Sequence, residues 1–229
     1  MLRSDLVFTL RAVAASSRPC YEGRVGRSLT AKEKIDRAAY ALFTRHGVHA
    51  VGVDTIVARS GVGKMTLYRH YSSKDALALA FFERRFELFS RGWQSALEAL
   101  ALPPREALLA IFDVLEDWYH SPGYTGCPVV KAVLQSRADE RVYAGALNYF
   151  SSVRSFLRKL AARAGLREPD AAAAQWHILI WGSIIGARAG DRDAARRAKE
   201  LAAAILSRER APAKIGVRAL FPKASRRRK

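Results

Sequence analysis

The segment Val53–Tyr71, VDTIVARSGVGKMTLYRHY, decides the fold. It predicts two short helices joined by a tight turn. Gly61 lies where the first helix must stop, a position that suits a residue tolerant of positive φ. The second helix has Leu67 as its main apolar anchor, and its other side chains are mostly cationic or hydrogen-bonding. A helix held at a steep angle by a glycine-containing turn, with a polar and basic outer face, is suited to reading the major groove of DNA.

The sequence GVGKMTLYRHY of residues 61–71, followed by Ser-Lys-Asp-Ala-Leu at 73–77, resembles the DNA-binding signature of the TetR family of bacterial transcription regulators. The resemblance covers residues 28–89. It implies an all-α fold, with an N-terminal three-helix helix-turn-helix DNA-binding domain and a C-terminal helical ligand-binding and dimerisation domain. The alternative is a generic helical hairpin whose polar face is merely solvated.

We expect four regions along the chain. Residues 1–28 are interpreted as a basic, disordered extension, although a basic arm that touches DNA and a processed signal remain alternatives. Residues 29–89 are assigned to the helix-turn-helix domain, with the reading motif at 52–71. Residues 90–207 are assigned to the ligand-binding and dimerisation domain, and residues 208–229 to a basic, disordered tail.

The net charge of +18 is unevenly distributed along the 229 residues. Residues 78–206 carry only +3, whereas residues 30–77 carry +4 and residues 207–229 carry +8. An excess of positive charge in the reading domain and the tail suits a polyanionic partner. A general preference for arginine, which also aids solubility, is the alternative explanation for the tails.

The cysteine content favours a reducing cytosol, and the resemblance implies a protein of the bacterial cytoplasm that is associated with the nucleoid when bound to DNA. Half of the residues are hydrophobic, yet no apolar run is long enough to span a membrane, so no membrane partner is expected. Cys20 and Cys127 cannot form a disulfide framework, and no Cys/His spacing suggests zinc. Cys127 is interpreted as a buried structural residue, with a redox sensor as the alternative. We expect no metal and no cofactor.

Two capping patterns predict where the N-terminal helices begin. Thr30-x-x-Glu33 predicts a capping box for the first helix, which Gly47 would end. Ser72-x-x-Asp75 predicts a second capping box, opening a long helix from about Lys74 to Leu100. This helix would link the reading domain physically to the rest of the chain.

The C-terminal half reads as further helices after the break at Pro103-Pro104. The stretch 171–190 is apolar almost all round, so it must be covered on two sides. Asp191 is predicted to cap the next helix, whose alanine-rich face allows close approach. The resemblance implies that these two helices pair with their copies in a homodimer, as a four-helix bundle. A monomeric core is the alternative.

The resemblance also implies the DNA contacts. Lys64 and Thr66 are expected at base edges, whereas Leu67 and Tyr71 pack inward. Met65 departs from the family pattern, which generally has a small residue here, and is expected to protrude toward the groove and touch a thymine methyl group. Phosphates are expected to bind the remaining candidates. The full predicted DNA-binding set is Thr55, Lys64, Met65, Thr66, Tyr68, His70 and Lys74.

Aromatic residues of the C-terminal domain are candidates for contacts with an unknown small-molecule effector, expected to be apolar or aromatic. The predicted set is Phe86, Trp93, Phe112, Trp118, Tyr119, Tyr143 and Trp176. Most of them are also plausible plain core residues.

The functional hypothesis is a sequence-specific transcription regulator, a ligand-released repressor that binds a double-stranded, palindromic DNA operator as a dimer. A ligand-independent architectural DNA binder is one alternative. A helical enzyme is the other, although the sequence contains no nucleophile elbow, no phosphate-binding glycine loop and no His-Glu metal motif, so no catalytic residue is assigned.

Overall fold

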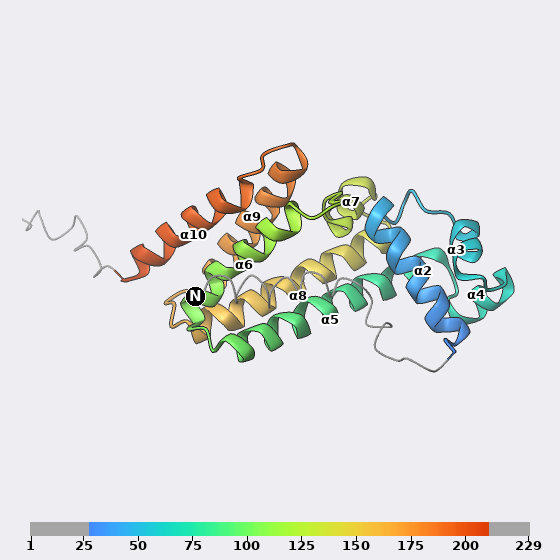
Figure 1. Cartoon of the computed structure of the whole chain (residues 1–229), viewed down its shortest axis with the longest axis horizontal. Coiled ribbons are helices and arrows are strands. Elements are labelled where there is room, and N and C mark those ends of the chain that lie inside the picture. Colours follow the sequence, from blue (N-terminus) through green and yellow to red (C-terminus); the bar gives the residue numbers. More distant parts are fainter. Residues whose placement is uncertain (1–27, 211–229) are drawn as a thin grey trace, which may run out of the picture.

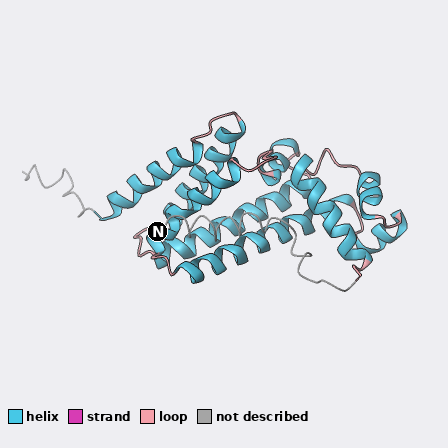
Figure 2. Ribbon diagram, in the orientation of Figure 1, coloured by secondary structure: helices cyan, strands magenta, loops and turns pink. Residues whose placement is uncertain are grey.

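The computed structural model describes residues 28–210, with the side chains of 95–100 and 210 excepted. All regular structure in this range is helical (Figure 2). The expectations for residues 1–27 and 211–229 lie outside the described residues. The helices are α2 (Ala31–His46), α3 (Val53–Ser60), α4 (Lys64–His70), α5 (Lys74–Leu100), α6 (Pro104–Tyr119), α7 (Pro128–Gln135), α8 (Arg141–Arg163), α9 (Pro169–Arg188) and α10 (Ala194–Arg210).

The described part of the chain is elongated, with α2, α3 and α4 gathered at one end (Figure 1). Helix α5 runs from this end along α8, and α9 and α10 lie together toward the other end (Figure 1). Helix α10 continues to Arg210, past residue 208 where we expected the tail to begin.

Local signals explain where the N-terminal helices start and stop. The Thr30 side chain accepts a hydrogen bond from the Glu33 N–H, and the Glu33 carboxylate accepts one from the Thr30 N–H, so the first predicted capping box is confirmed. Gly47 ends α2, as predicted. Gly61 ends α3 in the left-handed conformation, at φ 66°, which a glycine adopts without steric cost.

Two predicted caps were wrong by one or two residues. Ser73, not Ser72, caps α5, because its hydroxyl accepts a hydrogen bond from the Ala76 N–H at 3.1 Å. Asp191 does not directly precede α10, which begins at Ala194. Its carboxylate instead accepts a hydrogen bond from the Asp193 N–H in the preceding turn. The helix bounds of α5 nevertheless agree with the prediction.

A compact apolar core fixes α4 on the reading domain. Leu67 is completely buried, in a cluster that includes Ile35 of α2 and Ile56 of α3. Tyr71 is also buried, so both residues pack inward as predicted. Because α4 has only seven residues, too few to be stable alone, its position depends on this anchor.

We expect Leu67→Ala to lower the free energy of unfolding by about 2–5 kcal/mol, because it removes a fully buried side chain and leaves a cavity. Urea denaturation followed by circular dichroism measures the change. Met65→Ala on the same helix is the control, since Met65 is 79% exposed and its loss should change stability by less than about 0.5 kcal/mol. Equal losses in the two variants would contradict this packing.

Candidate nucleic-acid interface and effector cavity

The reading end of the molecule presents α4 with its polar face outward. Thr55, Lys64, Met65, Tyr68 and His70 are exposed, and Thr66 is half-buried. Helix α4 is short, and neither its N-cap, Gly63, nor that of α3, Gly52, has a side chain for capping. The N–H groups at these two helix starts are therefore left without a side-chain cap.

Lys64, the first residue of α4, is held by a neighbouring carboxylate. Its ammonium group donates a hydrogen bond to Asp54 Oδ1 at 2.8 Å. This hydrogen bond and the attraction of the Asp54 carboxylate raise the pKa of Lys64. Both side chains are exposed, so the pair is available for exchange with another anion.

Lys74, on the first turn of α5, differs from the other predicted DNA contacts. It is half-buried, and its ammonium group donates a hydrogen bond to the His49 carbonyl at 3.3 Å. Burial lowers the pKa of Lys74. The structure thus gives this side chain a contact with the loop that follows α2.

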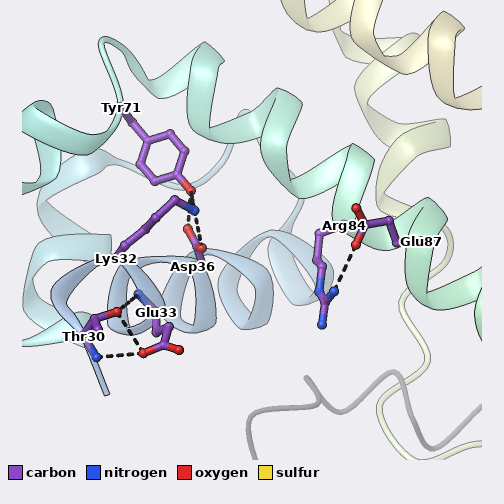
Figure 3. A network of polar contacts seen from close by, with 7 residues as sticks. All are labelled: Thr30, Lys32, Glu33, Asp36, Tyr71, Arg84 and Glu87. Carbon is purple, nitrogen blue, oxygen red and sulfur yellow. Dashed lines mark hydrogen bonds and ion pairs between the residues drawn. The ribbon is translucent and has the colours of Figure 1, made fainter. Parts of the chain in front are cut away.

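A polar network fixes the end of α4 to α2 (Figure 3). The Lys32 ammonium donates hydrogen bonds to Asp36 and to the Tyr71 hydroxyl, each at 2.8 Å. The Tyr71 hydroxyl in turn donates to Asp36. Burial and the hydrogen bond to Asp36 raise the pKa of Tyr71 to about 12. Since Tyr71 directly follows α4, this network and the buried Leu67 hold the reading helix at both its centre and its end.

The sequence analysis missed a second group of cations on the reading domain. Lys34 and Arg37 of α2 and Arg59 of α3 line a hollow of about 300 Å³ between the two helices. The three-residue spacing of Lys34 and Arg37 on one helix was a usable signal, but the approach of Arg59 depends on how α3 packs against α2.

The helical body contains an apolar cavity of about 160 Å³. Its walls come from α2, α5, α6, α8 and α9, with Cys127 before α7. The lining residues are Tyr40, Arg85, Leu88, Phe89, Trp93, Ile111, Val114, Leu115, Trp118, Cys127, Tyr149, Val153, Ile180, Trp181 and Ile184.

The cavity includes only part of the predicted effector set. Trp93 and Trp118 line it. Phe86 does not line the cavity, but its ring centre lies 6.2 Å from that of the lining residue Tyr149. The predicted residues that do not line the cavity are Phe86, Phe112, Tyr119, Tyr143 and Trp176.

Three of these residues are buried in the core instead. Trp176 is completely buried, and its indole N–H donates a hydrogen bond to the Leu108 carbonyl at 3.0 Å. Phe112 is buried in the core. The Tyr119 hydroxyl shares a hydrogen bond with Ser183 Oγ at 2.7 Å, and burial raises the pKa of Tyr119.

The described residues contain no group of three or more His, Cys, Asp or Glu side chains placed to hold a metal ion. No helix in the described range has the length and apolar character needed to cross a membrane.

Comparisons with known proteins agree with this arrangement. Residues 35–81 match the family model of bacterial regulatory proteins of the tetR family. The HTH-type transcriptional activator FasR of Mycolicibacterium smegmatis is 35% identical over 127 residues, which are 53% of this chain and 57% of FasR. The putative mycofactocin biosynthesis transcriptional regulator MftR of Mycobacterium tuberculosis is 41% identical over 58 residues, 25% of this chain and 29% of MftR. The matches thus span little more than half of the first relative and less of the second.

The structural likeness extends beyond the reading domain. SCO4454, a TetR-family transcriptional regulator from Streptomyces coelicolor, superposes with a TM-score of 0.66 at 25% identity, over 78% of this chain and 95% of that chain. The family model thus covers most of the reading domain, and the structural likeness extends over the helical body that carries it. Residues 35–81 of this chain therefore form the DNA-binding domain of the tetR family of bacterial regulatory proteins.

Proposed function

We propose that this protein regulates transcription by binding a near-palindromic DNA operator as a homodimer, and that a small effector in the apolar cavity releases it. The observation that carries the proposal is the construction of α4. The helix is anchored by the buried Leu67 and presents an exposed polar and cationic face. Membership in a family of transcription regulators agrees with the prediction of a protein that is not an enzyme.

The exposed residues of α4 supply the direct contacts in this proposal. Lys64 and Thr66 bind base edges, and Met65 touches a thymine methyl group in the major groove. Tyr68 and His70 of α4 and Thr55 of α3 bind phosphates. Lys74 reaches a phosphate with the ammonium group that also donates to the His49 carbonyl. These phosphate contacts supply the salt-dependent part of the affinity, and DNA-bound protein is then associated with the nucleoid of the bacterial cytoplasm.

The dimer is assigned to α9 and α10. Both helices expose large aliphatic side chains, namely Ile178 and Ile185 of α9 and Leu201 of α10. Ile178 and Ile185 are seven residues apart, so they lie on the same side of α9. Packing this surface against a second copy would bury them and bring two reading domains to two half-sites.

The effector acts by preferring one arrangement of the reading domains. Trp93 and Trp118 are its proposed aromatic contacts. To move the population almost entirely from one arrangement to the other, the effector must bind the favoured arrangement about 5.5 kcal/mol more tightly than the other. Two connections can carry the change: α5 is continuous from the reading domain into the cavity wall, and His49 Nε2 hydrogen-bonds with Ser136 Oγ at the end of α7, at 2.7 Å. Release of the protein from its operator raises or lowers transcription of the gene, according to where the operator lies relative to the promoter.

Footprinting of the purified protein on the DNA upstream of its own gene tests the proposal. We expect a protected near-palindrome whose half-site centres are one helical turn, about 10 base pairs, or a multiple of this apart. Protection that follows only A·T content, with no defined half-sites, would instead support a ligand-independent architectural DNA binder. Absence of any specific protection there and across a genomic fragment library would overturn the proposed function.

A further inference from the structure

Arg85 is an anomaly in the wall of the effector cavity. It lies on α5 and contributes the one formally charged side chain among the described lining residues. Its guanidinium group lies over the Trp118 ring, 5.9 Å from the ring centre. Its Nε atom is buried and has no hydrogen-bond partner among the described residues. A buried charge is unfavourable unless it is paired and hydrogen-bonded.

The groups around Arg85 do not neutralise it at neutral pH. Burial by itself would lower the pKa of Arg85, and interactions with Tyr40, Cys127 and Tyr149 raise it. Burial also raises the pKa of Tyr149, so its hydroxyl group is uncharged at pH 7. The guanidinium is thus a permanent cation facing neutral oxygen and aromatic partners.

The neighbouring residue shows the contrast. Arg84, one position earlier on α5, has a carboxylate partner, because its Nη1 lies 3.0 Å from Glu87 Oε2 (Figure 3). In the body of the protein, Lys199 is likewise held by Asp113. The side chains of Arg84 and Lys199 are 32% and 30% exposed, and each is paired with an acid, whereas the groups that interact with Arg85 include none. The Nε atom of Arg84 also lacks a hydrogen-bond partner among the described residues, so the missing acid is what distinguishes Arg85.

We propose, on the basis of the effector site above, that the effector is an organic carboxylate with a compact apolar body and that Arg85 binds its carboxylate group. A guanidinium group can donate two parallel hydrogen bonds to a carboxylate, a strong and direction-specific pairing. The aromatic walls at Trp93 and Trp118 then enclose the apolar body. This proposal replaces the expectation of a purely apolar or aromatic effector.

The dimensions of the cavity limit the ligand. A dry apolar cavity of about 150 Å³ accommodates benzene in another protein, and the cavity here is about 160 Å³. A single aromatic ring or a short aliphatic chain therefore fits without rearrangement. A single cation matches a single negative charge, which favours a monocarboxylate over a dianionic phosphate ester.

Paired probes separate charge from shape in a binding test on the full chain. We would titrate 3-phenylpropionate and its uncharged amide, and octanoate and its amide, and follow tryptophan fluorescence and calorimetry. We expect at least one carboxylate to bind 10-fold or more tightly than its amide at pH 7. Arg85→Met should abolish that preference, and Arg85→Lys should retain part of it. Arg84→Met is the matched control and should leave the preference intact.

Operator binding measured in the same preparations distinguishes this proposal from the proposed function. If both carboxylates bind no better than their amides while operator DNA is still bound, carboxylate recognition is overturned and the regulator remains. An unchanged preference in Arg85→Met would also overturn it. If Arg85→Met does not fold, judged by its thermal transition, the carboxylate–amide ratio of the original protein and the Arg85→Lys variant decide the question.

Discussion

Glutamate in place of Ile178 or Leu201 is expected to separate the protein into monomers and to weaken operator binding by at least about 100-fold. The change in affinity follows from the gap between specific operator affinities and the nonspecific affinity of DNA binders, about 10⁻⁸ M or tighter against 10⁻⁴–10⁻⁶ M. A monomer reaches one half-site and loses the second. Ile178 and Leu201 are 71% and 57% exposed, so a carboxylate at either position is hydrated in the monomer but would lie unpaired in the interface.

Light scattering with size-exclusion chromatography measures the mass, and a fluorescence anisotropy titration of the operator measures the affinity. Leu134→Glu is the matched control, since Leu134 is 74% exposed on α7, outside the proposed interface. It introduces the same charge change and should remain a dimer with unchanged operator affinity. Dimers that persist in both the Ile178→Glu and the Leu201→Glu variant would locate the interface on another face.

The reading domain was predictable because its determinants are local. The capping box at Thr30 and Glu33 and the left-handed position at Gly61 are read directly from adjacent residues. Even local signals have limited precision where two candidates adjoin. The choice between Ser72 and Ser73 as the cap of α5 depends on which residue is extended at the helix start, and it is Ser73, at φ −157°.

The effector cavity was predictable only in part, because its walls depend on how several helices rotate against one another. The apolar periodicity of a helix shows that a residue is buried but does not show against what. Trp176 and Trp118 both lie on amphipathic or apolar helices, yet Trp176 is buried in the core with its indole N–H bonded to the Leu108 carbonyl, whereas Trp118 lines the cavity. Arg85 was missed for the opposite reason, since an arginine on a long helix is usually solvated.

The contact between Lys64 and Asp54 was also outside the reach of the sequence, although both residues belong to the quoted segment. The nine positions between them include a turn, and only the angle between α3 and α4 brings the ammonium group within 2.8 Å of the carboxylate. The pair matters for function because it places an acid beside the proposed base-reading lysine.

Lys64→Ala is expected to weaken operator binding by more than Tyr68→Ala does, about 10–100-fold against about 5–10-fold. Tyr68→Ala removes one proposed phosphate contact. Lys64→Ala removes a DNA contact and also leaves the Asp54 carboxylate, which is 83% exposed, without its cation next to the phosphates. Its repulsion then adds to the lost attraction.

A double-mutant cycle separates the two contributions. Asp54→Asn alone should strengthen operator binding, because Lys64 then does not have to give up its ion pair with Asp54 before it contacts DNA. In the Asp54→Asn, Lys64→Ala double variant the affinity should recover part of the loss seen in Lys64→Ala. Lys159→Ala, an exposed cation on the distal half of α8, controls for net charge and should leave affinity within about twofold, as expected for a charge outside the contact surface. If Asp54→Asn leaves the affinity of the Lys64→Ala variant unchanged, Asp54 does not face DNA, because a carboxylate near the phosphates must weaken binding once Lys64 no longer neutralises it.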